Sequence, residues 1–171
     1  MRKAPPIAWV VLGVVSVLTV AVAPSVVVAE GFGAAPAIRS LAGERLEFVI
    51  RWGMIPAGRA TLEVETAPRE RMVLRATARS LQWIDWMYLV RERMESTVTV
   101  PGLLPERFFK TTRDGRHRTR VEELLFDRRA GTVTYRRDEQ EQASLEVTPG
   151  ARDALASFYA FRTLDFEGEQ V

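Results

Sequence analysis

The stretch Gly43–Glu65, GERLEFVIRWGMIPAGRATLEVE, decides the fold. Its first part alternates large apolar residues with mostly charged ones, the apolar ones being Leu46, Phe48, Ile50 and Trp52. Since successive side chains of a strand point to opposite faces, these four are expected to share one face. The alternation resumes at Ala60, after a connection that contains glycine and proline. The stretch therefore predicts two β-strands joined by a turn, in a register that keeps Phe48 and Trp52 out of water.

Strand-like segments recur along the rest of the chain at intervals of about ten residues. They are expected at residues 72–80, 91–100, 106–113, 118–127, 132–137 and 143–147, and residues 167–171 have the pattern of a further strand start. The turns between them are charged, and Asp114-Gly115 is a hairpin signal. Consecutive strands separated by short polar turns favour an antiparallel meander.

The apolar period changes after residue 147. Thr148 is expected to cap a helix whose first residue is Pro149 and which ends near Leu164. Its apolar side consists of Ala154, Leu155, Phe158 and Phe161. Such a stripe covers one face of a sheet. The expected fold class is therefore mainly β, an antiparallel curved sheet or half-barrel with a C-terminal helix packed on its concave side.

Residues 1–29 have the pattern of a signal peptide. Two basic residues precede an apolar, uncharged run over residues 7–23, and Val27-Val28-Ala29 offers small residues to a signal peptidase. We expect cleavage after Ala29, with a cut after Ala23 or a retained membrane anchor as alternatives. Residues 30–42 are then a flexible lead-in and residues 43–171 a single β-rich domain, exported to the periplasm or facing the outer membrane.

Composition excludes several classes of function. The chain has 24 Lys+Arg, 22 Asp+Glu and no cysteine, and cleavage would remove Arg2 and Lys3 to leave a formally neutral protein. Nucleic acid is therefore not an expected partner. The one histidine, His117, lies in a turn, so zinc sites of the usual kind are excluded. Phosphate loops, dinucleotide fingerprints and nucleophile elbows are absent from the sequence. We expect no catalytic residue, no metal, no cofactor and no enzymatic activity.

The segment Leu81–Val90, LQWIDWMYLV, concentrates aromatic residues around one acid, Asp85. One interpretation is a core strand or barrel corner with aromatic filling. The other is an aromatic rim at the mouth of an apolar pocket. A single carboxylate between two tryptophans does not by itself make a site.

Four pieces of the chain together resemble one bacterial exported family, domain of unknown function 3108. Gly43-Glu44, Phe48, Trp52 and Ala57-Gly58 resemble its opening signature, Leu104-Pro105 with Phe108 its Leu-Pro strand start, Phe126-Asp127 its Phe-Asp strand end, and Asp153, Leu155, Tyr159 and Arg162 its helix motif Asp-x-Leu-Ser-x-x-Tyr-x-x-Arg. Ala156 departs from the serine of that motif. The resemblance implies an exported, β-rich envelope protein without an established activity. It also implies further C-terminal strands, which we expect to be missing from this chain.

Two functions follow as hypotheses. The first is an envelope protein that binds a lipid or other apolar small molecule between sheet and helix, touching the membrane only peripherally after signal cleavage. Its candidate groove residues are Phe48, Trp52, Leu62, Trp83, Trp86 and Phe158. The alternative is a structural or scaffolding protein that binds an envelope protein through a sheet edge or a basic hairpin. The candidate docking residues of that hairpin are Lys110, Arg113, Arg116, Arg118 and Arg120, which also suit anionic lipid head groups or a solvated turn.

Overall fold

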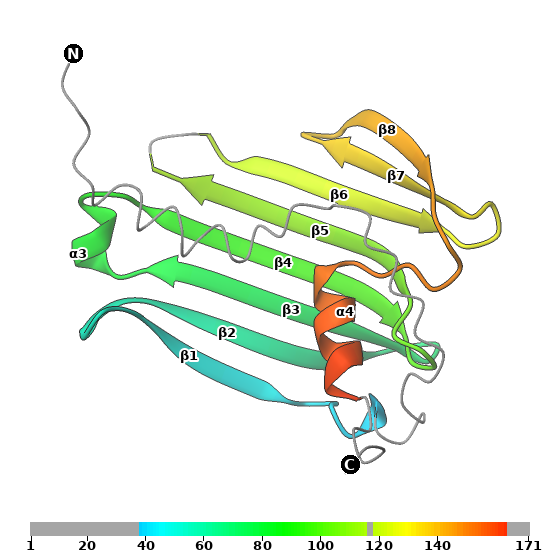
Figure 1. The fold of residues 1–171 in the computed structure, drawn as a ribbon, viewed down its shortest axis with the longest axis horizontal. Coiled ribbons are helices and arrows are strands. Elements are labelled where there is room, and N and C mark those ends of the chain that lie inside the picture. Colours follow the sequence, from blue (N-terminus) through cyan, green and yellow to red (C-terminus); the bar gives the residue numbers. More distant parts are fainter. Residues whose placement is uncertain (1–37, 116–117, 164–171) are drawn as a thin grey trace, which may run out of the picture.

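The computed structural model describes residues 38–115 and 118–163. Eight strands form one antiparallel sheet whose spatial order is the order of the chain, β1 to β8 (Figure 1). The strands are β1 Arg45–Trp52, β2 Ile55–Ala67, β3 Arg71–Ser80, β4 Val90–Thr99, β5 Pro105–Asp114, β6 Arg120–Asp127, β7 Thr132–Arg137 and β8 Gln140–Glu146, and the helices are α3 Gln82–Asp85 and α4 Ala154–Arg162. The predicted fold class, an antiparallel sheet with a C-terminal helix packed on it, is confirmed.

The first hairpin forms as predicted, with Leu46 opposite Leu62 and Phe48 opposite Ala60. The prediction that Phe48 avoids water is wrong, because 47% of this residue is exposed. The cause is position: β1 lies at the edge of the sheet, whereas α4 packs on β3 and β4.

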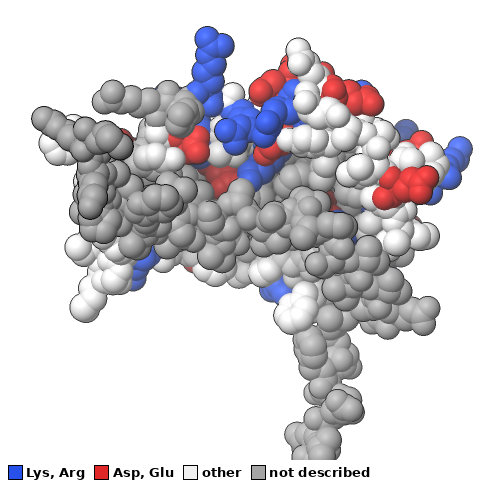
Figure 2. Space-filling model, turned by 45° about the horizontal axis from the view of Figure 1, so that its top comes forward, with Lys and Arg blue, Asp and Glu red and all other residues white. Residues whose placement is uncertain are grey.

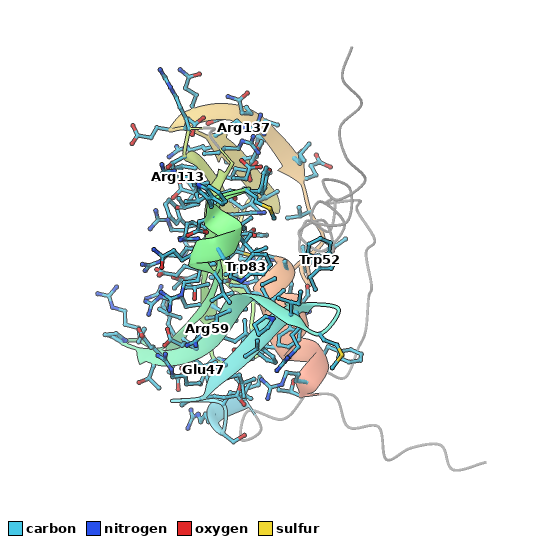
Figure 3. The ribbon with its side chains drawn as sticks, turned by 90° about the vertical axis from the view of Figure 1, so that its left-hand side faces the viewer. Glu47, Trp52, Arg59, Trp83, Arg113 and Arg137 are labelled. Carbon is cyan, nitrogen blue, oxygen red and sulfur yellow. The ribbon has the colours of Figure 1, made fainter. Side chains whose placement is uncertain are left out.

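Side chains alternate between two faces of the sheet. The inner face carries α4, and Figure 3 shows the sheet curving around that side. Its buried centre comprises Val64, Met72, Leu74, Met94, Val98 and Phe108 from the sheet together with Leu155 and Tyr159 from α4. Ile38 and Leu41, which the sequence assigned to a flexible lead-in, also belong to this core. The packed domain therefore begins before Gly43.

The outer face, which is the side away from α4, carries ion pairs between neighbouring strands. Arg75 on β3 pairs with Glu65 at 2.6 Å and with Glu95 at 3.2 Å. On β5, Arg107 pairs with Glu123 at 2.6 Å. Figure 2 views the molecule from the side of α4, and basic and acidic side chains lie next to one another in its coloured part as well.

Helix α4 differs from the prediction at its start and in its buried side. Asp153, not Thr148, is the N-cap: its carboxylate accepts hydrogen bonds from the Ala156 amide at 2.9 Å and from the Ser96 hydroxyl at 2.5 Å. This buried cap ties the helix to β4 and sets its rotation. The buried side is Leu155, Ala156, Tyr159 and Ala160, while Phe158 and Phe161 are exposed. The small side chains of Ala156 and Ala160 let the helix approach the sheet closely. The side of the helix that carries Phe158 and Phe161 is too bulky for such an approach.

The aromatic segment is not a core strand. Residues 82–85 form the short helix α3, and Trp86 is 92% exposed, so the interpretation as aromatic core filling is wrong. The reason is a polar anchor, in which Asp85 accepts hydrogen bonds from Ser80 and, at 2.9 Å, from Arg91. The Arg91 guanidinium lowers the pKa of Asp85, and both contacts turn the chain back toward β4.

Several sequence predictions lie outside the described residues. They are the signal peptide, the strand start at residues 167–171, and the side chains of Arg116 and His117. Among the described helices, none is both long and apolar enough to cross a membrane.

Candidate functional site

One row of side chains on the inner face changes from apolar to polar as it crosses the sheet. Its members are successive cross-strand partners, and we call them the amphipathic row: Phe48, Ala60, Ala78, Glu92, Thr112 and Arg120. The row crosses β3 and β4 close to α3. The residues of these strands that form the core with α4 lie farther from α3. Ala60 and Ala78 carry the smallest side chains of the row.

Glu92, in the polar half of the row, forms a buried ion pair with Lys110 of the neighbouring row. Lys110 Nζ lies 2.9 Å from Glu92 Oε1, and only 12% and 6% of the two side chains are exposed. Thr112 Oγ1, on the strand opposite Glu92, is buried without a hydrogen-bond partner. Buried polar atoms nearly always have a partner, so this hydroxyl beside a buried ion pair indicates a place for an external polar group.

The next row extends the polar side. Lys110 lies opposite Glu122, and Glu122 opposite Arg137. The Tyr135 hydroxyl donates to Glu122 Oε1 at 2.8 Å, and burial raises the pKa of Tyr135. This tyrosine is therefore a neutral donor at physiological pH.

The candidate groove residues do not form one cluster. Phe48 begins the amphipathic row, Leu62 packs against the core, and Phe158 lies on α4 with 44% of it exposed. The three tryptophans lie at the α3 end of the sheet: Trp52 closes β1, Trp86 is exposed, and Trp83 Nε1 donates to the Pro56 carbonyl at 3.1 Å.

The candidate basic hairpin is divided between the two faces, so it is not one patch. Lys110 and Arg120 lie on the inner face with the amphipathic row, whereas Arg113 lies opposite Arg91 on the outer face. Arg118 lies in the exposed turn before β6. Sequence reasoning missed the pairing of Lys110 with Glu92 across two strands. The available signal was Glu92 itself, the one charged residue in the buried series Val90, Glu92, Met94, Ser96 and Val98 of β4.

The described residues contain no cluster of three or more Asp, Glu or His side chains that could hold a metal ion. A family model described as "Protein of unknown function (DUF3108)" matches residues 47–169. The chain belongs to the DUF3108 family. Searches of curated proteins and of solved structures gave no match.

In this DUF3108 protein the motif residues hold α4 in place. Arg162 at the helix end pairs with Glu44 before β1, one of its nitrogens lying 2.7 Å from Glu44 Oε1, and this contact lowers the pKa of Glu44. Asp153 caps the helix start, and Tyr159 between them is fully buried. Packing therefore explains the positions of Asp153, Tyr159 and Arg162 of the motif.

Replacing Tyr159 with phenylalanine should remove part of the alkaline sensitivity of this DUF3108 protein. Burial raises the pKa of Tyr159 from 10.0 to about 12. Between these values the unfolded state loses the phenolic proton and the folded state keeps it, so stability falls as pH rises. A shift of two pH units corresponds to roughly 2–3 kcal/mol at pH 12. Urea unfolding of both proteins across this range measures the effect, and equal alkaline losses would contradict the assignment.

Proposed function

We propose that the protein binds an amphipathic lipid on the inner face of its sheet, beside α4. The observation that carries the proposal is the amphipathic row, which joins an apolar surface to a buried ion pair and a buried hydroxyl without a partner. A molecule with an apolar chain and a polar head matches this order along its length. A binding role is preferred to catalysis because the sequence contains no catalytic motif.

The apolar chain would lie along Phe48, Ala60 and Ala78. Phe48 is half exposed, so a hydrocarbon chain laid on it removes apolar surface from water. The head group would lie over β4–β6. A hydroxyl or amine of the head adds a donor to the Glu92–Lys110 pair, and its acidic oxygen faces Arg120 and accepts from the Thr112 hydroxyl. Phosphatidylglycerol and its lyso form carry both kinds of group.

The expected signal peptide would place this activity in the cell envelope. In the cell envelope, the molecules that combine an apolar chain with a polar head group are the lipids exchanged between its membranes. The proposal is therefore a periplasmic lipid-binding protein.

The rival proposal is a scaffold that pairs a partner strand with an edge of the sheet. The observation in its favour is β8, the last strand in the sheet order. Its residues include Glu141 and Glu146, and most of its side chains are exposed. Charged side chains along an edge strand are a common protection against pairing, so this edge favours the rival less than the amphipathic row favours a lipid.

Replacing Ala78 with leucine should block the lipid site without unfolding the sheet. The larger side chain fills the space above β3, where Ala78 lies between Ala60 and Glu92. A steric conflict of this kind costs about 1–3 kcal/mol, which corresponds to roughly a 5- to 150-fold loss of affinity. Native mass spectrometry with added lysophosphatidylglycerol counts the bound lipid directly.

The matched control is Thr97→Leu, which adds a leucine to the outer face of β4. It should leave lipid binding unchanged. A wild-type protein that binds no lysophosphatidylglycerol, or an Ala78→Leu protein that binds it as well as wild type, would reject the proposal. Loss of binding in both variants would assign the effect to general destabilisation and reject the site.

A further inference from the structure

Four arginines form a row across the outer face at the end of the sheet where α3 lies. Arg59 on β2 is opposite Arg79 on β3, Arg79 is opposite Arg91 on β4, and Arg91 is opposite Arg113 on β5. We call these four residues the arginine row. Like charges directly opposite each other on neighbouring strands destabilise a sheet. Folding alone therefore disfavours this arrangement.

Described carboxylates compensate only one member of the arginine row. Arg91 pairs with Asp85, whereas Arg59, Arg79 and Arg113 form no ion pair with a described carboxylate. Farther along the same face, Arg75 is surrounded by three glutamates, Glu63, Glu65 and Glu95. Arg75 therefore has acidic cross-strand partners that stabilise the sheet, whereas most of the arginine row has none. Three guanidinium groups of the row are left for an external anion.

An open hollow of about 490 Å³ adjoins the row. Arg59, Arg79, Thr61 and Thr77 contribute to its lining. Arg45 and Glu47 also line it and pair with each other at 2.8 Å. Guanidinium and hydroxyl groups are donors suited to phosphate oxygens, and arginine binds them in a bidentate manner.

The same end of the sheet exposes large apolar side chains. We call them the apolar tip: Met54 and Ile55 in the first hairpin, and Trp83, Trp86 and Met87 in and after α3. Met54 is 90% exposed and Trp86 92%. The hydrogen bond from Trp83 to the Pro56 carbonyl joins the two segments. Contiguous exposed apolar surface of this kind marks an interaction site.

We infer that the apolar tip and the arginine row together dock the protein on an anionic phospholipid bilayer. Figure 3 looks at this end of the molecule, with Trp83 near the middle and Arg59 and Arg113 on the side away from α4. Tryptophan prefers the membrane interface, and each arginine near an anionic surface adds to the attraction. Trp86, Met54 and Ile55 enter the interface while Arg79 and Arg113 bind lipid phosphates.

The position of the arginines supports a membrane over a protein partner. Arg79, Arg91 and Arg113 each lie one residue from the end of their strand, next to the tip. The head-group layer of a bilayer is several Å thick, so it spans both sets of side chains. The hollow includes Phe48 and Ala60 of the amphipathic row in its lining. The arginine row and the apolar tip share no residue with the amphipathic row, so the inference holds whether or not that row binds lipid.

The absence of cysteine from the chain permits a local test. Met87→Cys introduces one thiol in the tip, and Ala130→Cys introduces one in the exposed turn at the opposite end of the sheet. Each is labelled with an environment-sensitive nitrobenzoxadiazole dye in the full chain. Vesicles of phosphatidylcholine, with and without phosphatidylglycerol, are then added. We expect the dye at residue 87 to shift to the blue only with phosphatidylglycerol, and less so at high salt, while the dye at residue 130 does not respond.

Paired arginine variants complete the test. Arg79→Gln with Arg113→Gln should weaken vesicle binding at least about tenfold. Arg69→Gln with Arg129→Gln removes the same charge from exposed turns at the opposite end and should change it less than about twofold. Equal losses in both pairs, or no response at residue 87, would overturn the inference. A response at residue 87 that follows protein concentration without vesicles would assign the tip to a second copy of the chain and also overturn it.

Discussion

Replacing Tyr159 with alanine is expected to destabilise the protein by about 3–5 kcal/mol. The residue is fully buried between α4 and the sheet, where it contacts the core of Leu74 and Val98. Truncation removes an aromatic ring and leaves a cavity that the short helix cannot close. Since a domain of this size is stable by only about 5–15 kcal/mol, the loss is a large share of the total. Urea unfolding followed by far-UV circular dichroism measures it.

Two further variants serve as controls. One separates the contribution of the Tyr159 ring to stability from that of its hydroxyl, and the other compares a buried with an exposed aromatic side chain. Tyr159→Phe keeps the ring and removes an oxygen that has no hydrogen-bond partner, so stability at neutral pH should be equal or higher. Trp86→Ala removes a larger but exposed side chain and should change stability by less than about 0.5 kcal/mol. A small effect of Tyr159→Ala, close to that of Trp86→Ala, would mean that α4 does not close the core as described.

Replacing Lys110 with methionine should destabilise the protein by about 3–5 kcal/mol. The change removes the cation beside Glu92 and leaves that carboxylate buried without compensation. Methionine keeps a similar apolar stem, so lost packing contributes little. Equilibrium unfolding in urea at neutral pH measures the loss.

A double variant tests whether the charge is the cause. Lys110→Met combined with Glu92→Leu replaces the buried pair by apolar side chains and should recover most of the stability. The control Arg107→Met breaks the pair with Glu123 on the outer face, where Arg107 is 55% exposed. That loss should be about 0–1 kcal/mol. If the double variant is no more stable than Lys110→Met, the buried ion pair does not explain the effect.

The sheet could be predicted because alternation along each strand is a local property. The expected strand at residues 132–137 coincides with β7, and the other strands expected within the described residues agree with the structure to within a few residues. The buried side of helix α4 was harder to predict, because two different sets of apolar residues in its sequence recur with a helical period. The contact between Asp153 and Ser96 selects one of them, and these residues are 57 positions apart. The strand interpretation of Leu81–Val90 failed for the same reason, since Asp85 is held by side chains of β3 and β4.

The candidate site could be predicted only in part. Phe48 and Lys110 were candidates, but their positions on one face depend on the register of five strands, which no single segment contains. Glu92 and Thr112 become notable only in the folded structure, where Glu92 forms a buried ion pair and the Thr112 hydroxyl is buried without a partner. Arg113 was assigned with Lys110 to one patch because they are close in sequence, although odd spacing in a strand sends them to opposite faces.

The order of the sheet has a consequence for how the protein is made. Each strand pairs with the one before it, so the sheet can grow hairpin by hairpin as the chain emerges into the compartment where it folds. The cover over β3 and β4 comes last, because α4 follows β8 and the pair Glu44–Arg162 joins residues 118 positions apart. A nascent chain that ends before Ala154 can therefore hold a complete sheet whose Leu74 and Val98 face water. Its greatest need for a chaperone falls just before α4 emerges.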